Sequence, residues 1–327
     1  EMKAAWYEKT GDATDVLKVG ELADPSPGSN EVLISVKTSG LNPSDVKTRA
    51  GARGDLQFSR IVPHSDGAGI IVDVGKSVDS NRIGERVWIW NAAYGRPNGT
   101  CAELIALPEN QAVAMNETVG FDAGACLGIP ASTAYYGIFA DGSVRDKTIM
   151  ITGGSGAVGY YGIQLAKWAG AKVISTVSGK KKAQIVQDAG ADLVLNYKED
   201  NITESVLDFT KGAGVDRVLE VEFGGNIQIN KEIVKSNGSI SAYASVGVME
   251  PSFPFYDYMF RGIKINSFLI YTISENDREA VVKGITKALS EYSFNHMIAN
   301  SFSLNEVVKA HESVESDTNI GNTIICI

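Results

Sequence analysis

The feature of this sequence that most restricts its fold is a glycine-rich loop at residues 154–159, which reads Gly-Ser-Gly-Ala-Val-Gly. An apolar segment, residues 148–152, precedes the loop, and a segment of helical length follows it. In this setting Gly154 permits a tight turn, Gly156 lets the backbone approach a pyrophosphate, and Gly159 lets the helix pack closely. The pattern predicts a dinucleotide site at a helix N-terminus. The alternative is a strand-to-helix turn that binds nothing.

Strands and helices alternate along the sequence around this loop. The expected strands are residues 148–152, 173–177, 192–195, 217–221 and 239–243, and the expected helices include residues 129–136, 158–169 and 181–189. Such alternation is typical of right-handed β-α-β units. It therefore predicts a parallel sheet for the middle of the chain.

The first 110 residues have a different pattern. Segments rich in β-branched residues occur at residues 31–37, 69–75 and 86–90, and turns rich in Gly and Pro separate them. The last six residues, 322–327, are again mostly apolar. Many short strands with such turns predict a small β-rich domain.

The last 60 residues are expected to contain two helices. Residues 274–277 and 303–306 both have the spacing of a capping box, a helix N-terminus in which two side chains bind backbone N–H groups. Val281, Ile285 and Leu289 follow the first box at helical spacing. These three side chains are therefore expected to face a core.

Size and composition narrow the class of protein. A chain of 327 residues is long enough for about two domains. No run of 18 apolar residues is present, so no transmembrane helix is expected. The net charge of −9 argues against a nucleic-acid partner. Three widely spaced cysteines and a start without an apolar signal core predict a reducing, cytoplasmic location.

The second predicted strand indicates which dinucleotide binds. A site for NAD needs an acidic residue at the end of this strand, where it binds the ribose 2′-hydroxyl. Residues 176–182 read Thr-Val-Ser-Gly-Lys-Lys-Lys and contain no acid, whereas Ser178 and Lys182 suit a 2′-phosphate. The alternative is a solvated helix start, but lysines in a first turn oppose the helix dipole. NADPH is therefore the expected cofactor.

Six segments together resemble a known family. They are residues 39–45 (SGLNPSD), 65–69 (SDGAG), 83–87 (IGERV), 128–135 (GIPASTAY), 153–159 (GGSGAVG) and 195–197 (LNY). In this order the chain resembles the medium-chain dehydrogenase/reductase superfamily, and within it the zinc-independent NADPH:quinone oxidoreductases, the zeta-crystallin group. The resemblance covers essentially the whole chain.

The resemblance implies an α/β protein of two domains. A GroES-like, β-rich catalytic domain is expected from residues 1–125 and 267–327. A Rossmann domain with a doubly wound parallel sheet, which binds NADPH, is expected from residues 126–266. Relatives bind their ligands in the cleft between two such domains. A homodimer is also the family expectation.

The resemblance also implies that no metal takes part. Zinc-using relatives hold their catalytic metal with a Cys, a His and a second Cys, and these positions correspond here to Asn42, Ser65 and Ile129. Those residues are not a set of zinc ligands. His64 lies one residue from a ligand position, but a lone His beside Asp66 is more often a surface or hydrogen-bonded residue than a ligand.

Two residues receive catalytic roles from the resemblance. Asn42 is expected to line the nicotinamide and substrate pocket and to hydrogen-bond a quinone oxygen, and Thr133 is expected to place a hydroxyl near the nicotinamide. For Thr133 the alternative is a helix hydroxyl that bonds its own backbone. Arg53 and Cys101 depart from the family pattern, which leaves the class of substrate open.

Thirteen residues receive cofactor-binding roles, and no residue is assigned to a metal. Pyrophosphate is assigned to Gly154, Ser155, Gly156, Ala157, Val158 and Gly159, the 2′-phosphate to Ser178, Lys182 and Tyr197, and the lining of the cofactor cleft to Asn226, Ala244, Ser245 and Phe268. For Tyr197 the alternative is an aromatic residue that packs on an edge strand.

The expected activity is a metal-free, NADPH-dependent reduction of a quinone or a similar electron-poor carbonyl compound. A quinone accepts a hydride without a Lewis acid, whereas an alcohol would need a base. Within enzymes, the alternative is reduction of an activated C=C bond in an enone or enoyl thioester. Outside enzymes, it is a non-catalytic NADPH-binding or crystallin-like structural protein. The expected partners are small molecules, with no nucleic acid and no membrane.

Overall fold

The computed structural model describes residues 1–317 and 319–327 and divides them into two compact units. The first unit consists of residues 1–129 and 296–327, and the second of residues 130–295. The sequence places the return to the first domain at residue 267, whereas the chain returns at His296. The reason is that helix α10 (Glu275–Glu291) packs against α4 (Ser132–Phe139) within the second unit.

That packing depends on a glycine. A Cβ at Gly284 of α10 would lie 1.9 Å from Cζ of Tyr135 on α4, so a larger residue there would require the Tyr135 ring to move. The expected helix at residues 129–136 also differs in detail. A π-helical turn, η3 (Leu127–Ala131), precedes α4 and contains Pro130, which therefore does not occupy the first turn of an α-helix.

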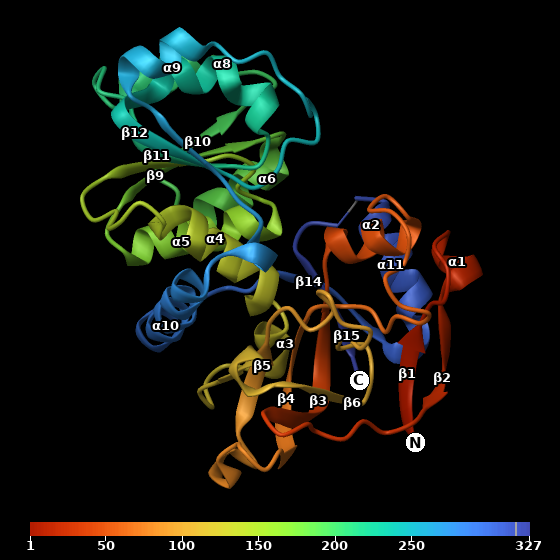
Figure 1. Cartoon of the computed structure of the whole chain (residues 1–327). Helices are drawn as coiled ribbons and strands as arrows, with labels where there is room; N and C mark the ends of the chain where they lie inside the picture. The colour runs from red at the N-terminus through yellow and green to blue at the C-terminus, as the bar shows by residue number, and fades with distance from the viewer. Residues whose placement is uncertain (318) are drawn as a thin grey trace. The chain divides into compact units, whose positions relative to one another are not determined.

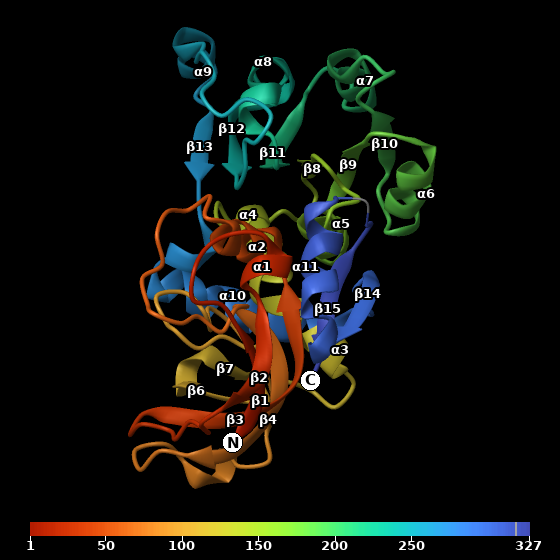
Figure 2. The same ribbon diagram turned by 90° about the vertical axis from the view of Figure 1, so that its right-hand side faces the viewer.

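The first unit is built on a seven-stranded sheet with a separate two-stranded sheet (Figures 1 and 2). The strand order is β14-β15-β3-β4-β5-β7, with β6 paired to β3, and β1 pairs with β2. The strands are β1 (Met2–Trp6), β2 (Lys18–Leu22), β3 (Glu31–Leu41), β4 (Asp66–Val74), β5 (Arg86–Ile89), β6 (Leu104–Pro108), β7 (Ala112–Ala114), β14 (Ile298–Ser303) and β15 (Asn322–Cys326). Because β15 lies antiparallel beside β3, both ends of the chain contribute to one unit.

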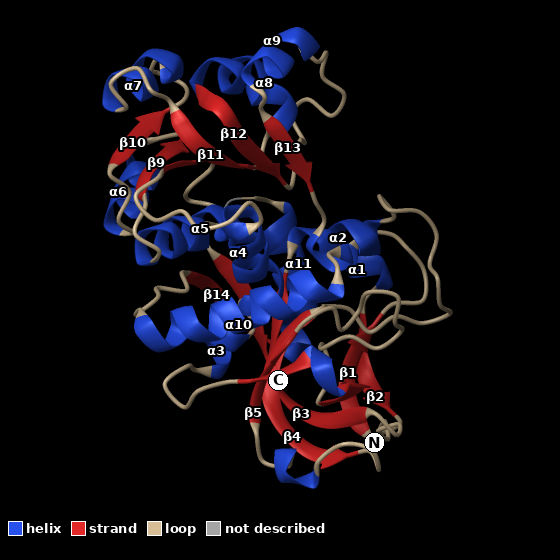
Figure 3. Cartoon of the chain, turned by 60° about the vertical axis from the view of Figure 1, so that its left-hand side comes forward, coloured by secondary structure: helices blue, strands red, loops and turns tan. Residues whose placement is uncertain are grey.

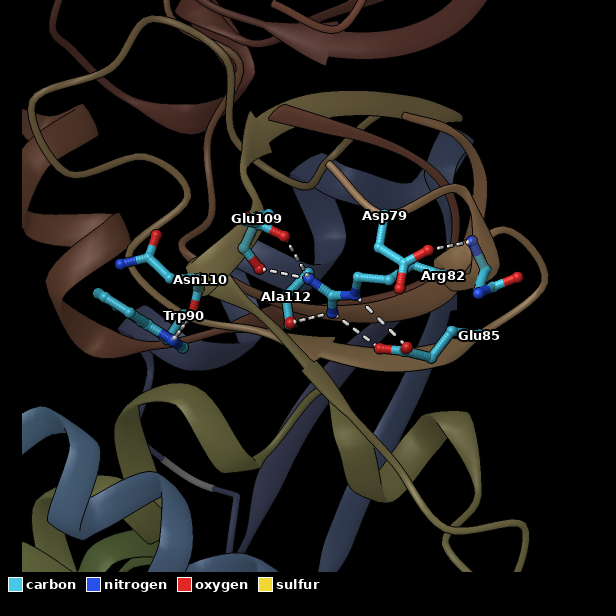
Figure 4. A network of polar contacts seen from close by, with 8 residues as sticks. Asp79, Arg82, Glu85, Trp90, Glu109, Asn110 and Ala112 are labelled. Carbon is cyan, nitrogen blue, oxygen red and sulfur yellow. Dashed lines mark hydrogen bonds and ion pairs between the residues drawn. The ribbon is translucent and has the colours of Figure 1, made fainter. Parts of the chain in front are cut away.

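Short helices complete the first unit. They are α1 (Ala13–Val16), α2 (Pro43–Ala50), α3 (Phe121–Gly124) and α11 (Val307–Glu315), with 3-10 turns η1 (Ser80–Arg82), η2 (Glu109–Gln111) and η5 (Leu304–Glu306). One polar network in this unit centres on Arg82 (Figure 4). The Arg82 guanidinium donates to Oε1 of Glu85 at 2.7 Å, to O of Ala112 at 2.6 Å and to O of Glu109 at 2.9 Å. It therefore ties η1 to the segment around η2.

The second unit contains a six-stranded parallel sheet in the order β10-β9-β8-β11-β12-β13. Its elements are β8 (Thr148–Ile151), α5 (Ala157–Trp168), β9 (Lys172–Val177), α6 (Lys180–Asp188), β10 (Leu193–Asn196), α7 (Ile202–Phe209), β11 (Val215–Glu220), α8 (Phe223–Ile233), β12 (Val234–Ala242), α9 (Phe255–Arg261), β13 (Lys264–Ser267) and η4 (Ile270–Thr272). Helices α4 and α5 lie on one face of the sheet and α8 on the other (Figure 3). The strand order reverses between β8 and β11, which confirms the expected doubly wound fold.

The sequence patterns of this sheet have a simple physical cause. Ile149, Ile151, Val173, Ile174 and Val218 are each 0% exposed. Strands of a parallel sheet that carries helices on both faces are buried on both sides, so they are apolar without alternation. The expected strands therefore agree with β8, β9 and β11 to within a few residues.

The expected capping box at Ser303 begins the 3-10 turn η5, and Ser274 of the other is the N-cap of α10. Ser274 Oγ accepts the N–H of Asp277 at 3.1 Å and begins α10, in which Val281 and Ile285 are buried as expected. Leu289 is only partly buried, since the next core position of α10 is Ala288. Within the described part of the chain, no helix has the length and apolar character that spanning a membrane requires.

Candidate active site

The glycine-rich loop joins β8 to α5 in the second unit. The left-handed residue of this turn is Gly153, with φ +64°, rather than Gly154. Gly154 is required for another reason, because its Cβ would lie 2.1 Å from Oγ of Ser175. A Cβ at Gly159 would lie 2.4 Å from O of Gly153, so this glycine allows α5 to approach the strand.

The start of α5 is suited to an anion. Gly156 is the N-cap of this 12-residue helix and has no side chain with which to bind the first N–H groups. A Cβ at Gly156 would contact only O of Gly153, at 3.3 Å, so this side of the loop is open. Helix N-terminal N–H groups and the helix dipole favour a phosphate at such a place.

Two of the three residues assigned to the 2′-phosphate meet directly. Lys182 Nζ donates to Ser178 Oγ at 3.2 Å across the first turn of α6. The N–H of Tyr197 donates to O of Val177 at 3.0 Å, which puts Tyr197 just beyond the ends of two paired parallel strands. Tyr197 is 55% exposed.

The segments that follow β11 and β12 are joined to each other. Ser245 Oγ accepts the N–H of Gly224 at 2.8 Å, and O of Ala244 accepts the N–H of Phe223 at 3.1 Å. Phe268 follows β13 and its ring lies edge-on to that of Tyr136, at 4.7 Å between centroids. These predicted cofactor residues therefore surround the carboxyl ends of the strands in the second half of the sheet.

The side chain of Asn226 donates a hydrogen bond to an acidic residue, Glu220, that sequence reasoning missed. Its Nδ2 donates at 2.5 Å to Oε1 of Glu220, which is 0% exposed at the end of β11. Burial raises the pKa of the Glu220 carboxyl, while hydrogen bonds from Asn226 and Asn230 oppose that change. The sequence signal that could have identified Glu220 is an acidic residue at the end of an apolar strand.

A second acid was also missed. Glu222 Oε2 accepts the N–H of Gly225 at 2.8 Å and that of Val248 at 3.1 Å. It therefore caps α8 and also holds the loop after β12.

Thr133, the predicted catalytic hydroxyl, lies in the first turn of α4 and is 5% exposed.

Asn42 belongs to the first unit, where it is the N-cap of α2 and 6% exposed. Its backbone N–H donates to Oδ2 of Asp45 at 2.8 Å, in the reciprocal manner of a capping box. Its side-chain Nδ2 donates to Oδ2 of Asp66 at 2.8 Å. Asp45 is therefore structural, as an acid in an Asn-Pro turn suggests.

Two of the three positions expected to correspond to zinc ligands, Asn42 and Ile129, meet at the Asp66 carboxylate. The N–H of Ile129 donates to the same Oδ2 of Asp66, at 3.1 Å, whereas Oγ of Ser65 accepts the N–H of Ala93 at 3.4 Å. A Cβ at Gly128 would lie 2.3 Å from Oδ1 of Asp66, so the backbone can close over this carboxylate only at a glycine. Asp66, which sequence reasoning did not single out, is the centre of this cluster.

The donor set of this cluster does not suit zinc. Ile129 has no ligand atom in its side chain, and the Asn42 amide nitrogen is not a ligand that zinc prefers. Among residues 1–317 and 319–327, no group of three or more His, Cys, Asp or Glu is arranged to hold a metal.

His64 is a buried, hydrogen-bonded residue and has a left-handed backbone, with φ +80°. Its Nδ1 lies 2.9 Å from Oγ of Ser39, and its Nε2 lies 3.0 Å from Nε2 of His311. Burial lowers the pKa of His64 to about 3, so the ring is neutral. Cys101 is also buried, and burial raises the pKa of its thiol.

Comparisons with known proteins agree with this geometry. Residues 28–147 match the family model described as alcohol dehydrogenase GroES-like domain, and residues 157–287 match the model described as zinc-binding dehydrogenase. Quinone oxidoreductase of Mus musculus is 30% identical over 309 residues, which cover 92% of this chain and 90% of that protein. The 2-methylene-furan-3-one reductase of Solanum lycopersicum is 31% identical over 276 residues, 77% of this chain and 71% of that protein.

Solved structures share the fold. The structure of Escherichia coli quinone oxidoreductase complexed with NADPH superposes with a TM-score of 0.83 at 20% identity, covering 99% of this chain and 100% of that one. At this level of identity the likeness establishes the architecture of the chain.

Proposed function

This chain belongs to the quinone oxidoreductase family of the medium-chain dehydrogenase/reductase superfamily and is an oxidoreductase, and we propose that it uses NADPH to reduce a quinone or a similar electron-poor carbonyl compound without a metal ion. In this proposal the second unit, residues 130–295, binds the cofactor, and the first unit binds the substrate. The cytoplasmic location expected from the sequence stays a prediction.

The second unit has groups that suit NADPH. When bound, this cofactor supplies a hydride from its nicotinamide ring. The open helix start at Gly156 would bind the pyrophosphate, and Ser178 with Lys182 would bind the 2′-phosphate. The relative from Escherichia coli was crystallised with NADPH, which supports the same choice of cofactor.

The observation that carries the proposal is the orientation of the Asn42 amide. A carboxylate only accepts hydrogen bonds, so the 2.8 Å contact with Asp66 identifies the atom facing it as Nδ2. One Nδ2 hydrogen goes to Asp66, and we assign the other to an oxygen of the substrate. Negative charge grows on a carbonyl oxygen as a hydride is added, and a positioned donor stabilises it.

The same donor would serve one alternative. An enone also develops negative charge on its carbonyl oxygen when a hydride adds to the β-carbon. The likeness to the 2-methylene-furan-3-one reductase of Solanum lycopersicum favours this reaction as the second candidate.

Steady-state kinetics test the proposal. NADPH oxidation is measured with a panel of small quinones and a panel of enones, before and after incubation with EDTA. We expect turnover with quinones, lower kcat/KM with enones, and no effect of EDTA. A preference for enones would establish the alternative. Loss of activity in EDTA with recovery in zinc would contradict metal-free catalysis, and no turnover with any acceptor would contradict an enzymatic role.

The second unit also has a surface that suits a homodimer. Strand β13 is the edge of the parallel sheet, and α9 lies at the same edge (Figure 2). Ten apolar side chains between residues 246 and 269 are at least 38% exposed: Val246, Val248, Met249, Phe253, Phe255, Tyr256, Met259, Phe260, Ile265 and Leu269. A bare strand edge beside a large apolar surface favours association. We propose that a second copy of this chain covers it.

A further inference from the structure

A chain of buried polar side chains crosses the first unit from α11 to the start of β4. Arg49 Nη1 lies 3.0 Å from Nδ1 of His311, and Nε2 of His311 lies 3.0 Å from Nε2 of His64. His64 Nδ1 then lies 2.9 Å from Oγ of Ser39. Arg49, His311, His64 and Ser39 are each 0% exposed.

The chain continues through one more hydroxyl. Ser39 Oγ lies 2.7 Å from Oγ1 of Thr100, and Thr100 Oγ1 donates to the backbone O of Asp66 at 2.6 Å. Thr100 is also 0% exposed, and its N–H donates to O of His64 at 2.9 Å. The chain therefore ends on the backbone of the residue that holds the Asn42 amide.

The direction of every hydrogen bond follows from the two ends. A guanidinium can only donate, so Nδ1 of His311 is an acceptor and its proton is on Nε2. That N–H donates to Nε2 of His64, whose own proton is therefore on Nδ1 and is donated to Ser39. Ser39 in turn donates to Thr100, because the Thr100 hydrogen goes to a carbonyl oxygen, which only accepts.

The same reasoning excludes a second charge on the chain. A doubly protonated His311 would present an N–H to the guanidinium N–H of Arg49, which leaves two donors face to face. Burial agrees with this, since burial first, and then the nearby guanidinium of Arg49, lower the pKa of His311 well below its ordinary value. The positive charge of Arg49 is instead met by Glu315, whose Oε1 lies 2.6 Å from Nη2.

We propose that His311 is a positioning residue for the reaction. Through the hydrogen bonds of His64, Ser39 and Thr100 it fixes the backbone at Asp66. The Asp66 carboxylate in turn orients the Asn42 amide toward the substrate. This role rests on the proposed function. It is one of orientation and not of proton delivery, because each hydroxyl hydrogen is committed toward Asp66 and a reversed chain would need Arg49 to accept a hydrogen bond.

Three variants test this role. His311→Leu removes both hydrogen bonds at similar volume, and His311→Gln keeps an acceptor and an N–H donor. Arg82→Leu is the control, because it breaks a partly buried network of the same unit that has no bond to Asn42 or Asp66 (Figure 4). Measured quantities are kcat, KM for quinone, Kd for NADPH by fluorescence, and Tm.

We expect kcat of His311→Leu to fall about 10–100-fold, since small displacements of positioned groups have effects of that size. Its Kd for NADPH should not change, because the glycine loop lies in the other unit. His311→Gln should recover most of kcat, and Arg82→Leu should lower Tm while kcat is kept. If His311→Leu and Arg82→Leu lose equal Tm and both keep kcat, the positioning role is wrong.

Two further measurements cover the other outcomes. Should His311→Leu not fold, Ser39→Ala, which interrupts the same chain, must lower kcat with Kd for NADPH unchanged, and an unchanged kcat overturns the role. The ¹⁵N shifts of the imidazoles test the chain without any substrate. Protonation at Nδ1 of His64 and Nε2 of His311 is expected, and the opposite tautomers would overturn the proposal even if quinones prove not to be substrates.

Discussion

At the scale of single residues, this chain replaces an expected acid with a hydroxyl and a cation. Ser178 and Lys182 meet at 3.2 Å where an NAD-binding protein would have Asp or Glu. Asn42, for which the resemblance implies a metal ligand in zinc-using relatives, donates its amide to Asp66 at 2.8 Å. Both sites therefore differ from their relatives in the chemistry of one or two side chains.

The preference for NADPH can be tested at Lys182. Lys182→Ala should weaken kcat/KM for NADPH by roughly 1–3 kcal/mol, the size of a hydrogen bond to a charged group, and barely affect NADH. Lys181→Ala is the matched control, since Lys181 is the exposed neighbour on the same helical turn. Equal losses for the two cofactors in Lys182→Ala would show that the side chain does not bind the 2′-phosphate.

At the scale of elements, function depends on how helices begin. Helix α5 begins at a glycine and has no side-chain cap, whereas α2, α8 and α10 begin at Asn42, Glu222 and Ser274. A side-chain cap occupies the N–H groups that a phosphate would otherwise bind. The first N–H groups of α5, like those of α6 at Gly179, are therefore not occupied by a side-chain cap.

The capping acid of α2 should make stability depend on pH. Burial raises the pKa of Asp45 to about 7, against the opposing effects of the Asn42 N–H and Arg53. A raised pKa means that the folded chain binds this proton more tightly than the unfolded chain. The contribution of this proton to the free energy of unfolding is therefore complete below about pH 4. It is lost as pH rises through about 7, and the loss is at most about 4 kcal/mol.

The isosteric variant Asp45→Asn isolates this effect, because its Oδ1 can still accept the Asn42 N–H and it does not ionise. Urea unfolding of both proteins is measured at pH 4.5 and pH 8. The free energy of unfolding of the variant should increase relative to that of wild type between these two pH values. Parallel changes in the two proteins would mean that Asp45 does not titrate in this range.

At the scale of the whole molecule, the arrangement of strands decides which surface is left exposed. Because β13 is the last strand of the parallel sheet, its outer edge and the apolar residues of α9 have no cover within the second unit. Phe260 is 79% exposed and Tyr256 66% exposed, both on α9.

A charged substitution on this surface should separate the proposed dimer. Phe260→Lys is expected to be a monomer in light scattering after size exclusion. The Tm of this variant is then that of the isolated subunit. Val72→Lys is the control, since Val72 is an exposed apolar residue on β4 of the other unit. If wild type is itself a monomer, or if Phe260→Lys stays dimeric, the proposed interface is wrong.

Much of the architecture could be predicted because it depends on residues close together in the chain. The glycine-rich loop, the apolar strands around it and the capping residues Ser274 and Ser303 act within one turn or one strand, so their spacing reveals them. The order of these patterns was enough for the fold class. The tight turn that the sequence assigns to Gly154 has its left-handed residue at Gly153, because adjacent glycines permit the same turn.

Only the tertiary structure decided the contacts between distant segments. His64 meets His311 across 247 positions, and Asp66 joins Asn42 to Ile129 of η3. The return of the chain at His296 likewise depends on how α10 packs against α4. No local spacing encodes such contacts, because they depend on strand register and on which surfaces pack together, and these are set by burial over the whole chain.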